Sequence, residues 1–148
     1  MKRESFRSKA KQVRAMFEQE FGGLEDPREV EKVEHPLMTV IIIVVFGVMC
    51  NLEGWDEYAE WAKTQRDWLA TFLDLAEDGS TPSADTLRRV FSRLKADAFR
   101  DAFLRWTKAL HEATRVDGSD SGGSIAIDGK ALRGAFRRAG ATTNLTLV

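Results

Sequence analysis

Apolar residues recur at three- and four-residue intervals through the first two thirds of the chain, and polar residues fill the positions between them. This spacing is typical of amphipathic α-helices, because about 3.6 residues complete one helical turn. The first such stretch ends at the glycine pair 22–23, and glycine favours helix termination. Its apolar positions are Phe6, Ala10, Val13, Phe17 and Phe21. The pattern predicts one amphipathic helix before residue 22.

The stretch 37–50 is the most apolar part of the chain and contains no charged residue. A buried strand is one alternative, because the stretch is rich in β-branched residues, and a membrane segment is another. The stretch is longer than most strands, which run about five or six residues, and shorter than the roughly 20 residues of a spanning helix. We expect a helix buried on nearly all sides, with His35 anchoring the turn before it and Cys50 as an unreactive core thiol at its end.

After Gly54 the apolar positions again lie close to one helical face, and acidic side chains lie away from it. The apolar positions are Tyr58, Trp61, Trp68, Phe72 and Leu75. A ligand-stacking site is one interpretation of this tryptophan-rich segment, but the helical spacing favours packing in the core. We expect one helix here, with its aromatic face buried.

Two short helices are predicted between residues 83 and 110. Ser83 is a favourable N-cap residue, and Asp85 lies in the first turn, where the helix dipole favours negative charge. The apolar positions are Leu87, Val90, Phe91 and Leu94 in the first helix and Phe99, Phe103, Trp106 and Leu110 in the second. Asp97 is expected to cap the second helix. Two capped helices with so short a break form a helical hairpin or a helix-turn-helix-like pair.

Beyond residue 117 the composition changes to that of a Gly/Ser linker over residues 118–123. The sequence Ile125-Ala126-Ile127 then indicates a β-strand that ends at Asp128-Gly129, and residues 144–148 indicate a second strand. We therefore expect a mainly α domain over residues 1–117, with about five helices. The linker joins it to a β-segment over residues 124–148.

The composition is that of a folded, soluble protein, since 43% of the residues are apolar and 9% aromatic, which excludes disorder over most of the chain. The single cysteine excludes a disulfide framework and a cysteine-based zinc site. The first 36 residues carry charges throughout, so no signal peptide is predicted and a cytoplasmic location is expected. The net charge of −1 conceals segregation, because acidic residues dominate positions 37–79 and basic residues exceed them beyond position 80. A polyanion would therefore meet the C-terminal half.

The segment 125–138, with the sequence IAIDGKALRGAFRR, is the first candidate for chemistry. A carboxylate at the end of a strand, here Asp128, lies at the rim of a sheet, where it can bind a divalent metal ion. The basic residues that follow it are Lys130, Arg133, Arg137 and Arg138. One acid beside several bases suits a site for Mg²⁺ and a phosphodiester. From the local sequence alone, a hairpin turn with a solvated basic surface is the simpler interpretation.

The helix predicted after Ser83 is the second candidate. Its outer side presents basic and hydroxyl side chains, which can contact DNA phosphates and base edges. These side chains are Arg88, Arg89, Ser92, Arg93 and Lys95. A solvated helix surface is one alternative, and a surface that docks a partner subunit is another, with the acidic face of residues 53–78 as a further docking candidate. Binding driven by phosphate contacts would weaken steeply with ionic strength.

Short motifs occur in one order along almost the whole chain. They are Asp26-Pro27-Arg28, His35-Pro36-Leu37, Trp55-Asp56-Glu57, Asp67-Trp68-Leu69, Pro82-Ser83, Asp85-Thr86-Leu87, Arg89-Val90-Phe91, Ile127-Asp128-Gly129-Lys130 and Leu132-Arg133-Gly134. In these motifs the chain resembles the N-terminal portion of the H-repeat-associated insertion-sequence transposases, a DDE-class family. The resemblance implies a helical N-terminal region joined to an RNase H-like catalytic domain, with Asp128 as its first catalytic carboxylate. It also implies Mg²⁺ as cofactor and duplex DNA as partner.

The DDE reaction needs three carboxylates to hold two metal ions, but no Asp or Glu follows Asp128 in this sequence. We therefore expect a truncated, catalytically incomplete transposase fragment that binds Mg²⁺ weakly at Asp128 and ends within the first two strands of an RNase H-like domain. Pairing with another copy or with the intact transposase would order that segment. The alternative function is a stand-alone helical module that pairs with the intact transposase. Neither a membrane partner nor a small-molecule cofactor is expected.

Overall fold

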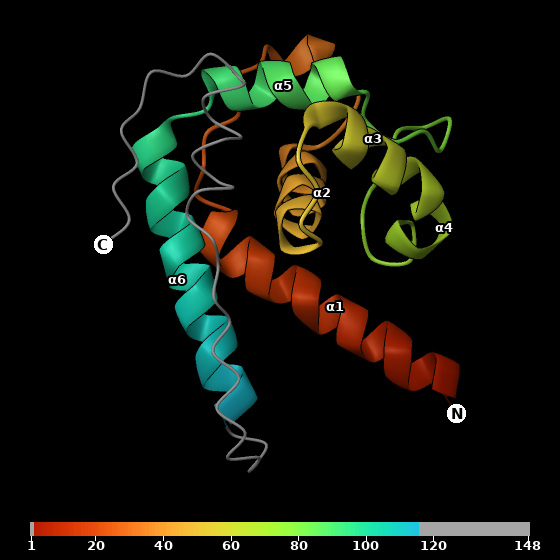
Figure 1. The fold of residues 1–148 in the computed structure, drawn as a ribbon, viewed down its shortest axis with the longest axis vertical. Helices are drawn as coiled ribbons and strands as arrows, with labels where there is room; N and C mark the ends of the chain where they lie inside the picture. The colour runs from red at the N-terminus through yellow and green to blue at the C-terminus, as the bar shows by residue number, and fades with distance from the viewer. Residues whose placement is uncertain (1, 116–148) are drawn as a thin grey trace.

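The computed structural model describes residues 2–115, and over this range the chain folds into helices joined by turns (Figure 1). The elements are α1 (Lys2–Phe21), the 3-10 helix η1 (Val30–Lys32), α2 (Leu37–Met49), α3 (Trp55–Thr64), α4 (Arg66–Leu69), α5 (Ala84–Arg93) and α6 (Ala96–Arg115). No β-strand occurs within residues 2–115, so the mainly α prediction is confirmed there. The linker predicted at 118–123 and the strands predicted within 124–148 lie outside the described residues.

Helix α2 lies at the centre of the core and contacts α1, α3 and α5. Nine of its 13 residues are buried, including the whole run 39–45. The prediction of a helix buried on nearly all sides is confirmed, and the strand alternative is wrong. Among the described residues, no helix is both long enough and apolar enough to cross a membrane.

The packing of α3 against α2 depends on Gly47. A Cβ atom at this position would lie 2.4 Å from Cδ1 of Tyr58, so only a residue without a side chain permits this approach. The helix ends at Met49, and two residues beyond that end Asn51 adopts the left-handed conformation at a φ of 61°. Cys50 is exposed, so its prediction as a core thiol is wrong, because the chain leaves the core at this end of α2.

Helices α1 and α6 pack on one another through an aromatic cluster. The ring centroids of Phe17 and Trp106 lie 4.7 Å apart, and those of Phe21 and Phe99 lie 5.5 Å apart. Phe17 also meets Phe46 of α2 edge-on at 5.7 Å, which joins the pair to the central helix. The predicted end of α1 before the glycine pair is confirmed.

The aromatic segment after Gly54 differs from its prediction, because it forms two helices, α3 and the short α4, rather than one. Phe72 is still buried, but it lies in a turn. Side chains from other helices bind the backbone here: Arg14 Nη1 donates to the Phe72 carbonyl at 2.9 Å and Thr39 Oγ1 donates to the Asp74 carbonyl at 2.9 Å. These tertiary hydrogen bonds hold the segment against the core without a continuous helix, and a sequence pattern does not reveal them.

Helices α5 and α6 are joined by the two residues Leu94 and Lys95, as the sequence predicts. The predicted N-cap is confirmed, because the Thr86 N–H donates to Ser83 Oγ at 3.2 Å. The predicted cap at Asp97 is wrong: α6 begins at Ala96, so Asp97 lies inside the first turn. The two helices pack mainly on different partners, α5 on α3 and α6 on α1 (Figure 1).

Candidate nucleic-acid interface

Helix α5 separates its apolar and basic side chains cleanly. Leu87, Val90 and Phe91 are buried against α2 and α3, because they recur at helical spacing. The basic residues predicted on the opposite side, Arg88, Arg89, Arg93 and Lys95, are all exposed. We call these four residues the α5 basic surface. The structure therefore places together the four predicted DNA-contact residues that lie within its described part.

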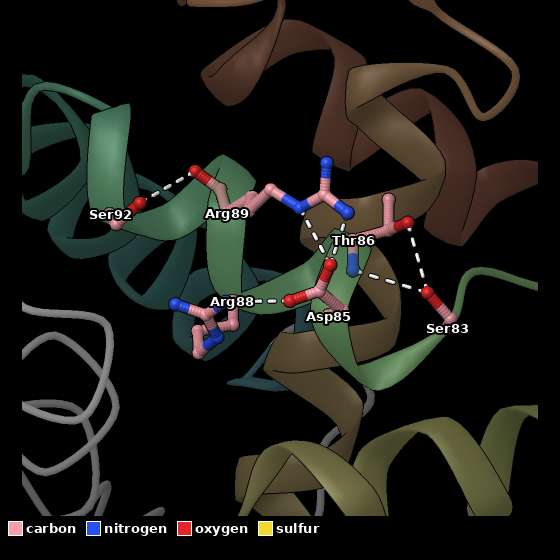
Figure 2. A network of polar contacts seen from close by, with 6 residues as sticks. All are labelled: Ser83, Asp85, Thr86, Arg88, Arg89 and Ser92. Atoms are coloured by element: carbon pink, nitrogen blue, oxygen red, sulfur yellow. Dashed lines mark hydrogen bonds and ion pairs between the residues drawn. The ribbon is translucent and has the colours of Figure 1, made fainter.

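Asp85 organises one end of this surface, as Figure 2 shows. Arg88 Nη2 donates to Asp85 Oδ1 at 2.6 Å, and Arg89 Nε donates to Asp85 Oδ2 at 2.7 Å. The Arg89 and Arg88 hydrogen bonds lower the pKa of Asp85 below its usual value of 3.8, so the carboxylate stays charged near neutral pH. The sequence predicts Asp85 only as a partner of the helix dipole, and its hydrogen bonds to two arginines were not predicted.

The remaining two cations differ in their partners. Lys95 Nζ lies 3.3 Å from Glu25 Oε2, in a pair whose side chains are both more than three-quarters exposed. Exposed pairs of this kind contribute little to stability and exchange readily with other anions. Arg93 pairs with no carboxylate within the part of the chain that the structure describes. It is therefore the cation of the α5 basic surface with the least competition for a new anion.

A pocket of about 240 Å³ lies between α5 and the segment 27–35; we call it the connector pocket. From α5 it is lined by Thr86, Arg89, Val90 and Arg93, which follow one another at helical spacing along one side. From the connector it is lined by Pro27, Arg28, Glu29, Lys32, Glu34 and His35. This pocket was not predicted from the sequence, although the motifs 26–28 and 35–37 mark the two ends of the segment that forms it.

Arg28 is held firmly at the edge of the connector pocket. Its Nε and Nη2 donate to the two carboxylate oxygens of Asp26 at 2.9 and 2.8 Å, and its backbone N–H donates to Asp26 Oδ1 at 3.0 Å. Burial alone would raise the pKa of Asp26, but these hydrogen bonds lower it overall. The side chain of Arg28 is only 12% exposed, so this bidentate pair fixes the backbone turn as well as the guanidinium.

His35 lines the pocket and is only 6% exposed. Its Nδ1 is buried and has no hydrogen-bond partner among the described residues. Burial lowers the pKa of His35 below its usual value of 6.5, Arg28 lowers it further, and Glu34 and Asp78 oppose the shift. The imidazole is therefore neutral near pH 7. His35 is buried in the turn before α2, and no side chain within the described part of the chain caps the start of that helix with a hydrogen bond.

The second predicted site lies outside the described residues. It comprises Asp128, Lys130, Arg133, Arg137 and Arg138, whose roles stay predictions. Over the described part of the chain, no group of three or more His, Cys, Asp or Glu side chains is arranged to hold a metal ion.

The sequence matches the family described as DDE_Tnp_1-associated over residues 18–107, which is more than half of the chain. The Escherichia coli K12 protein named "Putative transposase YncI" is 34% identical over 111 residues, which are 75% of this chain and 42% of the relative. The "H repeat-associated putative transposase YhhI" of the same strain is 32% identical over 121 residues, 80% of this chain and 30% of the relative. An "Uncharacterized protein in dhlA 3'region" of Xanthobacter autotrophicus is 36% identical over 118 residues, 79% of this chain and 38% of the relative.

The chain thus spans less than half the length of these relatives. No solved structure matches it. The matched family region runs from the end of α1 to α6, so it contains both the α5 basic surface and the connector pocket.

Proposed function

The chain belongs to the DDE_Tnp_1-associated family, and from that premise we propose that its helical region binds duplex DNA through the α5 basic surface. The observation that carries this proposal is the exposure of Arg88, Arg89 and Arg93 on one amphipathic helix of a transposase-related chain. DNA phosphates attract such side chains, and the binding releases the counterions that surround the duplex.

The ion pairs of α5 are compatible with this role. One carboxylate, Asp85, serves two arginines, and both arginine side chains are about half exposed or more. Each guanidinium has five N–H donors and directs only one or two of them at Asp85. A phosphate oxygen can therefore accept from the remaining donors while the hydrogen bonds to Asp85 stay in place. Contacts of this kind are directed at the phosphate backbone. They position a protein on DNA without reading its sequence, and we therefore expect low sequence specificity.

The residues beyond 117 extend the same proposal. Lys130, Arg133, Arg137 and Arg138 would add phosphate contacts, and Asp128 would be the first catalytic carboxylate. A bound Mg²⁺ would supply Lewis-acid stabilisation of the reacting phosphate at Asp128. No Asp or Glu follows Asp128 in residues 1–148, so we expect no DNA cleavage from these residues alone. Mg²⁺-dependent nicking of supercoiled DNA that is lost in Asp128→Ala would contradict this part of the proposal.

The test of DNA binding is the double variant Arg89→Gln/Arg93→Gln. We expect it to weaken the binding of a short duplex about tenfold or more at low salt, and to reduce the slope of log K against log salt by about 2, since each lost phosphate contact removes about 0.9. Fluorescence anisotropy over a series of salt concentrations measures both quantities. The matched control is Lys63→Gln/Arg66→Gln, which removes two exposed positive charges from α3 and α4. Equal effects of the two double variants would show that binding depends on net charge alone, which would contradict the proposal.

A second candidate function is a protein-interaction module that pairs with an intact transposase. The observation in its favour is the exposed acidic side of α3, formed by Asp56, Glu57 and Glu60. Such a surface suits a basic partner rather than DNA. Sedimentation of the chain with a full-length relative distinguishes the two functions, because charge reversal at Glu57 and Glu60 would abolish pairing while leaving DNA affinity undiminished.

A further inference from the structure

We infer that the connector pocket binds one phosphate group of the DNA backbone, beside the more open contacts of the α5 basic surface. This inference rests on the proposed DNA-binding function and names the place where one phosphate is enclosed. The pocket and the basic surface share Arg89 and Arg93, so DNA that lies along α5 passes the mouth of the pocket.

The charges of the pocket favour an anion. Its cationic lining residues are Arg28, Lys32, Arg89 and Arg93, and its acidic ones are Glu29 and Glu34. Lys32 Nζ pairs with Glu29 at 2.6 Å, and Arg28 is committed to Asp26, so these charges largely cancel. Arg89 shares the carboxylate of Asp85 with Arg88, so its charge is only partly offset, and Arg93 has no carboxylate partner among the described residues. These two arginines stand against the exposed Glu34. The balance that remains is positive.

His35 is an independent sign of a missing ligand. A buried polar atom without a hydrogen bond is costly, and most such atoms in native proteins have a partner. The unpartnered Nδ1 of His35 belongs to a ring that is more than nine-tenths buried and lines the pocket. An imidazole N–H can donate to a phosphate oxygen. Nδ1 has almost no accessible surface, so a rotation of the ring toward the pocket would bring it to a bound phosphate, which would supply the acceptor that the described residues do not.

The size and the donors of the pocket suit a phosphate. A volume of about 240 Å³ exceeds the roughly 30 Å³ of one water molecule several times over, so it admits a phosphate with its ester oxygens. Two arginines one helical turn apart, at positions 89 and 93, can each present a planar fork of donors to a tetrahedral anion. A planar carboxylate has two oxygens to accept from this set, whereas a phosphate diester has two non-bridging oxygens, which share one negative charge, and two ester oxygens.

The first test uses inorganic phosphate as the probe and the ring signals of His35 as the readout. In the full chain at constant pH, phosphate should shift the His35 ring resonances with saturation, and sodium acetate or chloride at equal ionic strength should not. Arg93→Gln should weaken phosphate binding about tenfold, whereas Arg66→Gln, which removes a charge outside the pocket, should leave it unchanged. Equal shifts with acetate, or no saturable shift with phosphate, would overturn the inference.

The second test separates the pocket from the proposed function. His35→Phe keeps the ring volume but removes both nitrogens, and it should weaken phosphate binding and reduce affinity for a short duplex severalfold, with a folded far-UV circular dichroism spectrum as the control. Duplex binding that needs Arg88 and Arg89 but is unaltered in His35→Phe would overturn the pocket while leaving the proposed function intact. Saturable phosphate binding with no duplex binding would overturn the proposed function, and with it the assignment of the phosphate to DNA.

Discussion

Helices α2 and α5 have similar lengths, 13 and 10 residues, but opposite constructions. Helix α2 carries no charge and is enclosed by α1, α3 and α5, so its residues are determined by packing. Helix α5 buries three residues and exposes three arginines. The arginines of α5 take no part in its packing: two of them share Asp85, and Arg93 pairs with no carboxylate among the described residues. Substitutions in α2 should therefore change stability, whereas substitutions on the outer side of α5 should change binding.

The largest effect is expected from Ile42→Asp in α2. Ile42 is fully buried, so the substitution places an unpaired carboxylate in an apolar core. We expect a loss of about 5 kcal/mol or more, which is comparable with the whole stability of a small domain. Far-UV circular dichroism and urea denaturation measure it, with Ile42→Val, expected to cost about 1 kcal/mol, as the control. A cooperatively folded Ile42→Asp protein would show that α2 does not form the core.

A smaller effect is expected from Gly47→Ala, also in α2. The added methyl group would lie 2.4 Å from the ring of Tyr58, which is itself buried and has little room to move. The clash should outweigh the gain of roughly 1 kcal/mol in helix propensity and leave a net destabilisation of about 1–3 kcal/mol. Gly54→Ala is the matched control, because nothing lies within 4 Å of a Cβ atom there. If Gly47→Ala is as stable as the control, the close approach of α2 and α3 is incorrect.

The smallest effect concerns pH and the connector that faces α5. The pKa of His35 is lowered in the folded protein, so the folded state binds fewer protons than the unfolded state as the pH falls through 6.5. Stability should therefore decrease between about pH 7.5 and pH 5.5, and it should recover as the pH rises. His35→Phe should lose this dependence in urea denaturation experiments at the two pH values. The same slope in both proteins would assign the titration to another group.

The arrangement of the core was predictable from the sequence because periodicity reports burial directly. The uninterrupted run 37–49, the apolar stripe of α5 and the cap at Ser83 follow from local residue chemistry, and the structure confirms them. The end of α4 at Leu69 was not predictable from the sequence. The segment that follows it accepts hydrogen bonds from Arg14 and Thr39, which are distant in sequence. Periodicity contains no information on such contacts.

The candidate site was predictable in part for the same reason. The exposure of the basic side chains follows from the helical spacing of Leu87, Val90 and Phe91. The connector pocket does not follow from helical spacing. It forms only where two segments distant in sequence meet, with Arg28 and His35 on one side and Arg89 and Arg93 on the other. The sequence marked both ends of the connector as motifs, and the structure supplies a physical reason for them in a partly buried ion pair and a buried histidine.

DNA binding by α5 is tested most directly by a map of duplex binding on the full chain, made by ¹H–¹⁵N NMR at low salt. We expect the largest shifts on α5, Lys95 and the segment 27–35. Buried α2 and the acidic side of α3 should stay unchanged, and the shifts should disappear as salt is raised. Shifts centred on α3 and α4, or no shifts within residues 84–95, would contradict the assignment of DNA binding to α5.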